Sequence, residues 1–316
     1  MPFKGYSAPA VRVEIKRGWN SSTILAALRK SGVLRDDFVP LLYMKTLRRG
    51  SSLKAGVYEF NRPLSPVDVL DKVIRADVTQ KTITIREGLD RFAIAELMAR
   101  EGFGTRADWL KLTADPELIK DIDPRADSLE GYLFPDTYKL TPGSSAATVV
   151  SLMIQNFRKS FGEELAFIGS GLDVHDTVTL ASIVETEAQR PEERPIVASV
   201  YLNRTRRNMP LQADPTVIYA MKLAGTWNGN IRKTDLQAQS PYNTYTVRGF
   251  PPGAIANPGL ASLRAAAAPA STSFIYFVSK NDGSHVFANS LDEHNRNVMI
   301  HQKRFFRDQV VQTTSP

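Results

Sequence analysis

The sequence predicts an α+β protein made of a small βααβ module followed by a larger mixed domain. Three observations carry this prediction: short alternating strands, helices with apolar residues at helical spacing, and a hairpin signal near the C-terminus. The chain has 316 residues, and because domains usually span ~100–200 residues, two or three domains are expected. A hydrophobic content of 42% with 23% charged residues is typical of a globular protein.

An internal repeat marks the N-terminal part of the chain. The first copy recurs seventy positions later, as Val13, Ile15, Gly18, Ile24, Leu28 and Gly32 followed by Ile83, Ile85, Gly88, Ile94, Met98 and Gly102. Each copy predicts a strand, a glycine turn, a helix and a glycine stop, with the strands at 11–16 and 82–86. Gly32 and Gly102 stand where a glycine typically ends a helix.

The remaining elements follow from periodicity and from turn residues. Further helices are predicted at 36–46, 66–75, 146–161, 176–188, 192–207, 214–221 and 291–307, and further strands at 56–60, 274–279 and 285–288. Ser65 before Pro66 is a typical helix start. The segment 281–283 joins the last two strands as a hairpin turn. A stretch rich in Pro, Gly and Asn at 237–260 predicts a long loop, which is usually functional or mobile.

Composition excludes several classes of chemistry. Lys and Arg total 40 against 33 acids, a net charge of +7 that favours anionic surroundings. The basic residues are scattered, and Arg206-Arg207 lacks interleaved aromatics, so nucleic-acid binding is a weak alternative. The absence of cysteine excludes disulfides and thiol chemistry. The four histidines lack the spacing of metal ligands, so no metal is predicted: His175, His285, His294 and His301.

One glutamate follows an apolar run. On a helix, Glu185 shares a face with Ala181 and Ser182, whereas Glu187 points away from that face. The pattern therefore predicts that Glu185 emerges from an apolar stripe and that Glu187 meets solvent. Desolvation raises the pKa of a glutamate, as a general acid near neutrality requires. The alternative from this pattern alone is a glutamate that only marks the end of a helix.

Eight segments spread over the chain carry a recognisable combination of motifs. They lie at 129–138, 181–185, 197–204, 211–219, 240–245, 251–255, 257–259 and 293–295. Together they resemble the endolytic murein transglycosylase family of the MltG type, also described as YceG-like. The resemblance covers nearly the whole chain, and the combined motifs are highly specific.

The resemblance implies both an architecture and a reaction. Residues 11–80 would form a LysM-like βααβ module, residues 81–316 the catalytic domain, and residues 1–10 a linker after a membrane anchor that this sequence lacks. The family cleaves peptidoglycan glycan strands with one glutamate and no cofactor. The position of Glu185 in its motif implies that it is this glutamate. The bond between N-acetylmuramic acid and N-acetylglucosamine would break to leave 1,6-anhydro ends, which would terminate or trim nascent strands.

Candidate substrate contacts come from the same segments. Six polar residues are expected to hold the sugar or line its cleft: Gln212, Asp214, Ser240, Tyr242, Asn243 and Thr244. Glu130 and Asp136 would either line the cleft or pin the turn at 134–135. The implied location is the periplasmic face of the cytoplasmic membrane, reached through an N-terminal helix, with glycan strands as substrate and peptidoglycan synthases as partners.

Two other readings remain open alongside the nucleic-acid binder. A hydrolytic muramidase would use Glu185 with Asp136 or Glu130 as a second carboxylate, and ~5–9 Å between the carboxyl groups would favour it. A wall-binding scaffold without catalysis would use the repeats to grip glycan.

Overall fold

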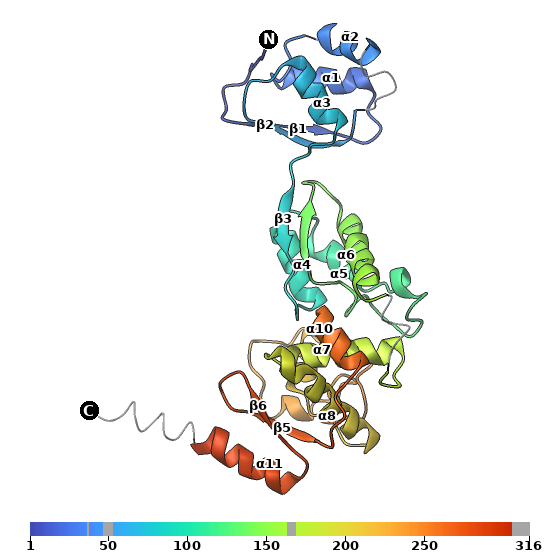
Figure 1. The fold of residues 1–316 in the computed structure, drawn as a ribbon, viewed down its shortest axis with the longest axis vertical. Helices are drawn as coiled ribbons and strands as arrows, with labels where there is room; N and C mark the ends of the chain where they lie inside the picture. Colours follow the sequence, from blue (N-terminus) through green and yellow to red (C-terminus); the bar gives the residue numbers. More distant parts are fainter. Residues whose placement is uncertain (37, 47–52, 163–168, 305–316) are drawn as a thin grey trace, which may run out of the picture. The chain divides into compact units, whose positions relative to one another are not determined.

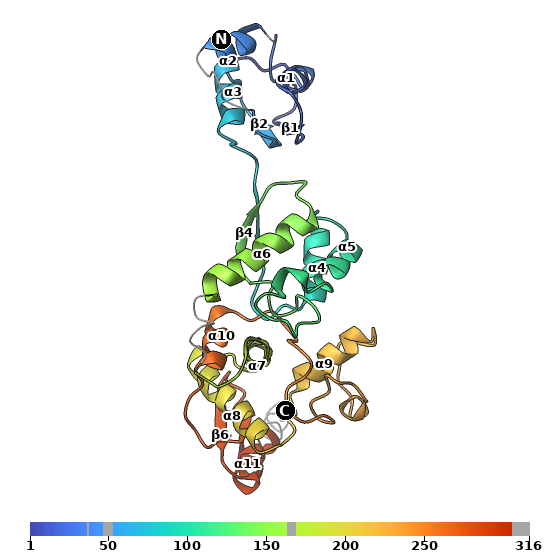
Figure 2. The ribbon, with the colours of Figure 1, turned by 90° about the vertical axis from the view of Figure 1, so that its right-hand side faces the viewer.

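A computed structural model describes residues 1–36, 38–46, 53–162 and 169–304. The chain divides into two compact units, which Figures 1 and 2 allow the reader to follow by colour. Unit 1 comprises residues 1–83 and 137–145, and unit 2 comprises residues 84–136 and 146–316. No helix within the described ranges is both long and apolar enough to cross a lipid bilayer.

Unit 1 is built around a two-stranded antiparallel sheet. Strand β1 (Val11–Ile15) pairs with β2 (Gly56–Phe60), and the helices α1 (Ser21–Lys30), α2 (Phe38–Thr46) and α3 (Pro66–Ile74) complete this part. Alternate strand residues and one helix face form the core: Val13, Ile15, Ile24, Leu25, Leu28, Tyr58, Phe60, Val69 and Leu70. The order βααβ followed by a helix is therefore confirmed.

Local capping explains where these helices begin. Ser65 Oγ accepts a hydrogen bond from Asp68 N at 3.2 Å, and the Asp68 carboxylate accepts one from Ser65 N at 3.3 Å. Pro66 occupies the first turn, as the sequence predicts. The repeat is equally visible, because Gly32 and Gly102 both take a positive φ, of 74° and 86°, just beyond α1 and α4 (Arg91–Arg100).

Two strands that are distant in the sequence form a second small sheet. Strands β3 (Lys81–Thr84) and β4 (Thr137–Leu140) form their own two-stranded sheet. The predicted strand at 82–86 is thus shorter and begins one residue earlier.

Unit 2 is mostly helical. Its elements are α4, α5 (Arg106–Thr113), α6 (Ala146–Phe161), α7 (Val174–Glu187), α8 (Arg194–Arg206), α9 (Asp214–Leu223), α10 (Leu260–Ala267), β5 (Tyr276–Ser279), β6 (His285–Ala288) and α11 (Leu291–Val298). Helices α8 and α10 pack against α7 (Figures 1 and 2). Every residue from 177 to 184 is buried, so α7 is enclosed on all sides and is the central helix of the unit.

Several elements differ from the sequence prediction. Helices α5 and α10 and strand β4 were not predicted. The predicted helix at 291–307 ends at 298 as α11 and continues as a π-helical segment, η5 (Met299–Arg304). Its last residues, 305–307, lie outside the described part of the chain. The hairpin of β5 and β6 is confirmed, with Val278 opposite Val286.

Candidate active site

One face of α7 holds the proline-rich loop at 251–259. It does so at three points: His175 Nε2 to Pro252 O at 2.7 Å, Ile255 N to Ser182 Oγ at 3.0 Å, and Gly259 N to Glu185 Oε2 at 3.0 Å. Ser182 and Glu185 lie on the face that the sequence placed together, and His175 lies two turns before Ser182 on that face. Glu185 therefore makes the last of three hydrogen-bond contacts that hold the loop against the helix.

The second oxygen of Glu185 is also occupied. Its Oε1 accepts a hydrogen bond from Arg194 Nη2 at 3.1 Å, and the two side chains are 5% and 11% exposed. Arg194 also lies 3.8 Å from Glu87, whose pKa is raised by desolvation and then by Glu185. A Cβ on Gly259 would lie 1.9 Å from Glu87 Oε1, so a larger residue there would displace the Glu87 side chain. Both oxygens of Glu185 thus bond within the protein.

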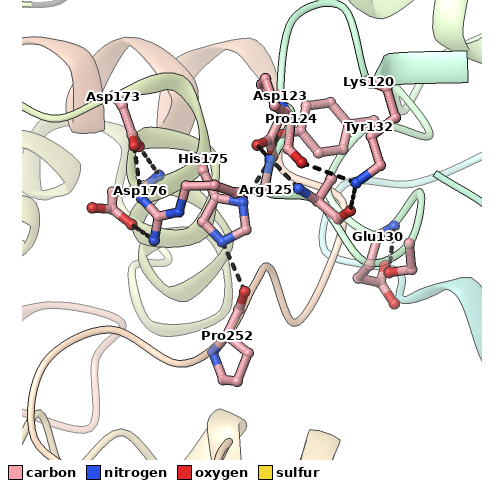
Figure 3. Close-up of polar contacts among 12 residues, drawn as sticks. Lys120, Asp123, Pro124, Arg125, Glu130, Tyr132, Asp173, His175, Asp176 and Pro252 are labelled. Carbon is pink, nitrogen blue, oxygen red and sulfur yellow. Dashed lines mark hydrogen bonds and ion pairs between the residues drawn. The ribbon is translucent and has the colours of Figure 1, made fainter. Parts of the chain in front are cut away.

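The first of these three contacts involves the buried His175, which Figure 3 shows. His175 Nδ1 contacts Asp123 Oδ2 at 2.8 Å, and its Nε2 contacts the Pro252 carbonyl. Since both partners only accept hydrogen bonds, both ring nitrogens must donate, which requires the imidazolium form. The pKa of His175 is accordingly raised, first by the hydrogen bond to Asp123. Asp123 also accepts the Tyr132 hydroxyl at 2.6 Å.

Glu187 faces a different environment from Glu185. It is the last residue of α7 and lines a cavity of about 530 Å³. Desolvation, and then the charge of Asp214, raise the pKa of Glu187 to about 7, while a hydrogen bond from Tyr201 opposes the shift. The negative end of the α7 dipole acts in the raising direction. Glu187 is therefore partly exposed, and its side chain lies at the wall of this cavity.

Two of the predicted contact residues lie in the same cavity. Gln212 and Asp214 both line it, together with Tyr245, whose hydroxyl donates to Asp214 Oδ1 at 2.6 Å. Gln212 adopts a positive φ of 52°, and its N–H bonds to the Thr244 carbonyl at 3.1 Å. The tight backbone here brings the two polar side chains to the cavity that Glu187 lines.

Four other predicted contacts lie away from this cavity's lining. Asn243 is 1% exposed, and its amide donates to three carbonyls of its own loop. Thr244, also 1% exposed, bonds to Thr216 Oγ1 at 2.8 Å. Ser240, Tyr242 and Asn243 line a separate, more apolar cavity of about 420 Å³ beside α9. The hydrogen bonds of Asn243 and Thr244 shape the loop.

The two remaining carboxylates also have partners within the protein. Glu130 is 3% exposed and accepts hydrogen bonds from Arg91 N and Asn257 Nδ2, at 2.9 and 2.7 Å. Desolvation, followed by the charge of a neighbouring aspartate, raises its pKa to about 8. Asp136 is exposed and accepts the Asn156 amide at 3.0 Å. Neither lines the cavity of Glu187, and the hydrogen-bond partners of Glu130 lie on α4 and in the loop at 251–259.

Sequence reasoning did not single out several lining residues. Tyr201 and Arg204 belong to the motif at 197–204, and Tyr245 ends the motif at 240–245, so these motifs were the available signal. His294 belongs to the motif at 293–295, whereas His285 lies in the C-terminal hairpin, which none of the motifs covers. In the part of the chain that the structure describes, no three His, Asp or Glu side chains gather to hold a metal ion.

Comparison with known proteins adds the family context. The model of the YceG-like family matches residues 13–300. A Bacillus subtilis endolytic murein transglycosylase is 32% identical, covering 93% of this chain and 86% of the relative. One from Streptococcus pneumoniae is 29% identical over 95% of this chain, which spans 60% of that relative. A crystal structure of a YceG-like protein from Listeria monocytogenes aligns with a TM-score of 0.63 at 30% identity, covering 91% of this chain and 98% of the other.

Proposed function

The chain belongs to the YceG-like family, and we propose that it cleaves murein glycan strands with Glu187 as the catalytic acid. Its relatives carry the name endolytic murein transglycosylase, and this chain is a lytic transglycosylase by the same resemblance. The observation that carries the choice of residue is the position of Glu187 in a cavity with a pKa raised to about 7. A carboxyl group with that pKa is half protonated at neutral pH and can donate a proton.

The proposed reaction needs one carboxyl group. Glu187 protonates the oxygen that links C1 of N-acetylmuramic acid to N-acetylglucosamine, and the C1–oxygen bond breaks. The 6-hydroxyl oxygen of the same muramic acid attacks C1, and its proton returns to Glu187. The product has a 1,6-anhydro end, and no water is consumed. An internal nucleophile has a high effective concentration, which offsets the absence of the second carboxylate that hydrolases use.

Glu185 takes a structural role in this proposal. One of its oxygens accepts a hydrogen bond from Arg194, and the other accepts one from the backbone of the loop at 251–259. Neither oxygen is therefore directed at a ligand. The earlier hypothesis of catalysis by Glu185 stays a prediction, and the geometry favours the neighbour two residues away. Gln212 and Asp214 remain proposed glycan contacts, because they line the cavity of Glu187.

A hydrolytic muramidase is the second candidate, favoured by one observation. Asp214 lines the same cavity as Glu187 and acts on its pKa, so a second carboxylate is present there. In that mechanism Asp214 would activate water or act as the nucleophile. The pairing differs from the one expected with Glu130 or Asp136, which lie elsewhere.

Product analysis separates the two candidates. Purified sacculi would be digested with the protein and the released muropeptides treated with borohydride before mass spectrometry. We expect anhydro ends that borohydride does not reduce. Reducible ends would identify a hydrolase, and no release of glycan at all would support a wall-binding scaffold.

The proposal extends to unit 1 and to the location of the protein. The order β1-α1-α2-β2 supports a LysM-like module that grips glycan, with a cavity of about 840 Å³ beside β2 and α3. Deletion of residues 1–80 should then lower co-sedimentation with sacculi, and unchanged sedimentation would contradict this role. We also propose a site of action at the periplasmic face of the cytoplasmic membrane, near the peptidoglycan synthases. Fractionation of cells and cross-linking of the full-length protein would test both.

A further inference from the structure

The hairpin of β5 and β6 supplies a second polar group to the cavity that Glu187 lines. His285 is the first residue of β6, and its side chain is one of the cavity's lining groups. About nine-tenths of that side chain is buried, at 9% exposure. The little surface that His285 retains therefore belongs to the cavity wall.

Glu193 fixes His285 with both of its oxygens. Glu193 Oε1 accepts the backbone N–H of His285 at 2.9 Å, and Oε2 lies 2.6 Å from Nδ1. Glu193 is itself 8% exposed and stands just before α8. A buried carboxylate that contacts both the backbone and the ring of one histidine sets the position and the orientation of that ring.

Aromatic neighbours prevent the imidazole from rotating. The Phe277 ring meets His285 edge-on, at 5.3 Å between centroids and 87° between planes. The Phe287 ring lies 6.4 Å away at 52°. With Nδ1 held by Glu193, the ring has one nitrogen left, and among the residues that the structure describes Nε2 has no hydrogen-bond partner.

The Glu193 carboxylate also selects the tautomer. A carboxylate accepts hydrogen bonds only, so it keeps a proton on Nδ1 of the neutral ring. The lone pair of that ring is then on Nε2. A sugar presents hydroxyl groups at every side of its ring, and each can donate a hydrogen bond to such an acceptor.

We propose that His285 is a substrate-contacting residue whose Nε2 accepts a hydrogen bond from a glycan hydroxyl, and that Glu193 is its positioning residue. This inference rests on the proposed function, because it requires glycan in the cavity of Glu187. It adds a substrate contact from β6, about a hundred residues after α7 in the sequence. His285 takes no part in proton transfer to the glycosidic oxygen, which remains the role of Glu187.

Two substitutions of His285 separate binding from structure. In H285N the amide nitrogen replaces Nδ1, so the bond to Glu193 is kept and the cavity-facing nitrogen is lost. In H285Q the amide reaches the place of Nε2, so the cavity-facing group is kept and the bond to Glu193 is lost. A binding role predicts that H285N is the worse binder, whereas a purely structural role predicts that H285Q is the more damaged protein in every assay.

The measurement is the affinity for soluble uncross-linked glycan strands in the E187Q background, where the ligand is not consumed. We expect E187Q/H285N to bind about tenfold more weakly than E187Q, the effect of one lost hydrogen bond in a partly desolvated site. E187Q/H285Q should stay within about threefold of E187Q. Unchanged affinity in E187Q/H285N, or weaker binding by E187Q/H285Q than by E187Q/H285N, would overturn the proposal.

Glu193 provides the test of positioning. In E193Q the amide oxygen still accepts the backbone N–H, but the amide nitrogen donates to Nδ1 and moves the ring proton to Nε2. The affinity of E187Q/E193Q should therefore fall about as far as that of E187Q/H285N, with H285N adding nothing further in the triple variant. Additive losses would contradict a shared role. If E187Q alone fails to bind glycan, the proposed function itself fails and the role of His285 with it.

Discussion

Glu185 and Glu187 stand two residues apart on one helix and occupy two different chemical environments. The oxygens of Glu185 bond to Arg194 and to a loop backbone, and its side chain is 5% exposed. Glu187 receives one hydroxyl hydrogen bond, from Tyr201, and lines an open cavity. Two residues of an α-helix are separated by ~200° of rotation, so the pair faces opposite sides. One of the two carboxyl groups is bonded within the fold, and the other lines the cavity.

The largest expected effect is on catalysis. E187Q should lower kcat by ~10²–10⁴-fold, because general acid catalysis contributes that much to the rate and no other group replaces the proton donor. The matched variant E185Q should keep kcat within about tenfold of the wild type, provided that it is assayed well below its melting temperature. Release of soluble muropeptides from sacculi measures both. An inactive E185Q beside an active E187Q would reverse the comparison.

The second effect is on stability, where E185Q should be the more damaging of the two substitutions. E185Q should lower the free energy of unfolding by about 2 kcal/mol or more, because it leaves the buried guanidinium of Arg194 without its close partner. E87Q is the control, since Glu87 is half exposed and lies 3.8 Å from the same guanidinium; its cost should stay below about 1 kcal/mol. Urea denaturation compares the variants. A loss in E187Q larger than that in E185Q would show that the structural role belongs to Glu187.

The pH dependence of the rate gives a third comparison. The proton donor must be protonated, so kcat should fall about tenfold per pH unit above the raised pKa of Glu187, about 7. The limb should persist in E185Q. A rate that stays constant up to pH 9, or a limb that E185Q removes, would contradict the assignment of the acid.

The smallest effect concerns the far end of the same helix face. The pKa of His175 is raised above its usual 6.5 in the folded protein. The stability that the imidazolium contributes is therefore fully present below about pH 6.5 and is lost as the pH rises through the folded value. The difference in unfolding free energy between wild type and H175Q should be about 1 kcal/mol at pH 5.5 and smaller at pH 9. Thermal melts at the two pH values check this, and a difference that grows with pH would refute it.

Much of the fold could be predicted from the sequence, because local turn, capping and periodicity signals agreed with the packing of the folded chain. The repeat placed β1, α1 and α4, and the Ser65-Pro66 start placed α3. Helix α5 was missed although Thr105 and Asp108 form a capping box that marks its start. Helix α10 was missed because the loop prediction extended to its first residue, although its alanine-rich sequence favours a helix.

The choice between Glu185 and Glu187 could not be predicted from the sequence, for a physical reason. Periodicity correctly placed Glu185 and Glu187 on different sides of α7, but a helix buried all round has no solvent face from which to choose the catalytic side. That choice depends on the hairpin of β5 and β6 and on the motif at 211–219, which close the cavity from positions distant in sequence. The family resemblance pointed to segments that line the cavity, with Gln212 and Asp214 among them, but it did not indicate which carboxylate lies there.

Direct titration of the Glu187 carboxyl tests the central claim most closely. Carbon-13 NMR of protein labelled at glutamate side-chain carboxyls would be followed from pH 4 to pH 9, and the E187Q spectrum would identify the Glu187 signal. Subtraction also separates it from Glu130, whose pKa is raised to about 8. The account predicts a midpoint near 7 that moves when glycan fills the cavity. A midpoint near the ordinary glutamate value of about 4.3 would leave no proton to donate at neutral pH and would contradict it.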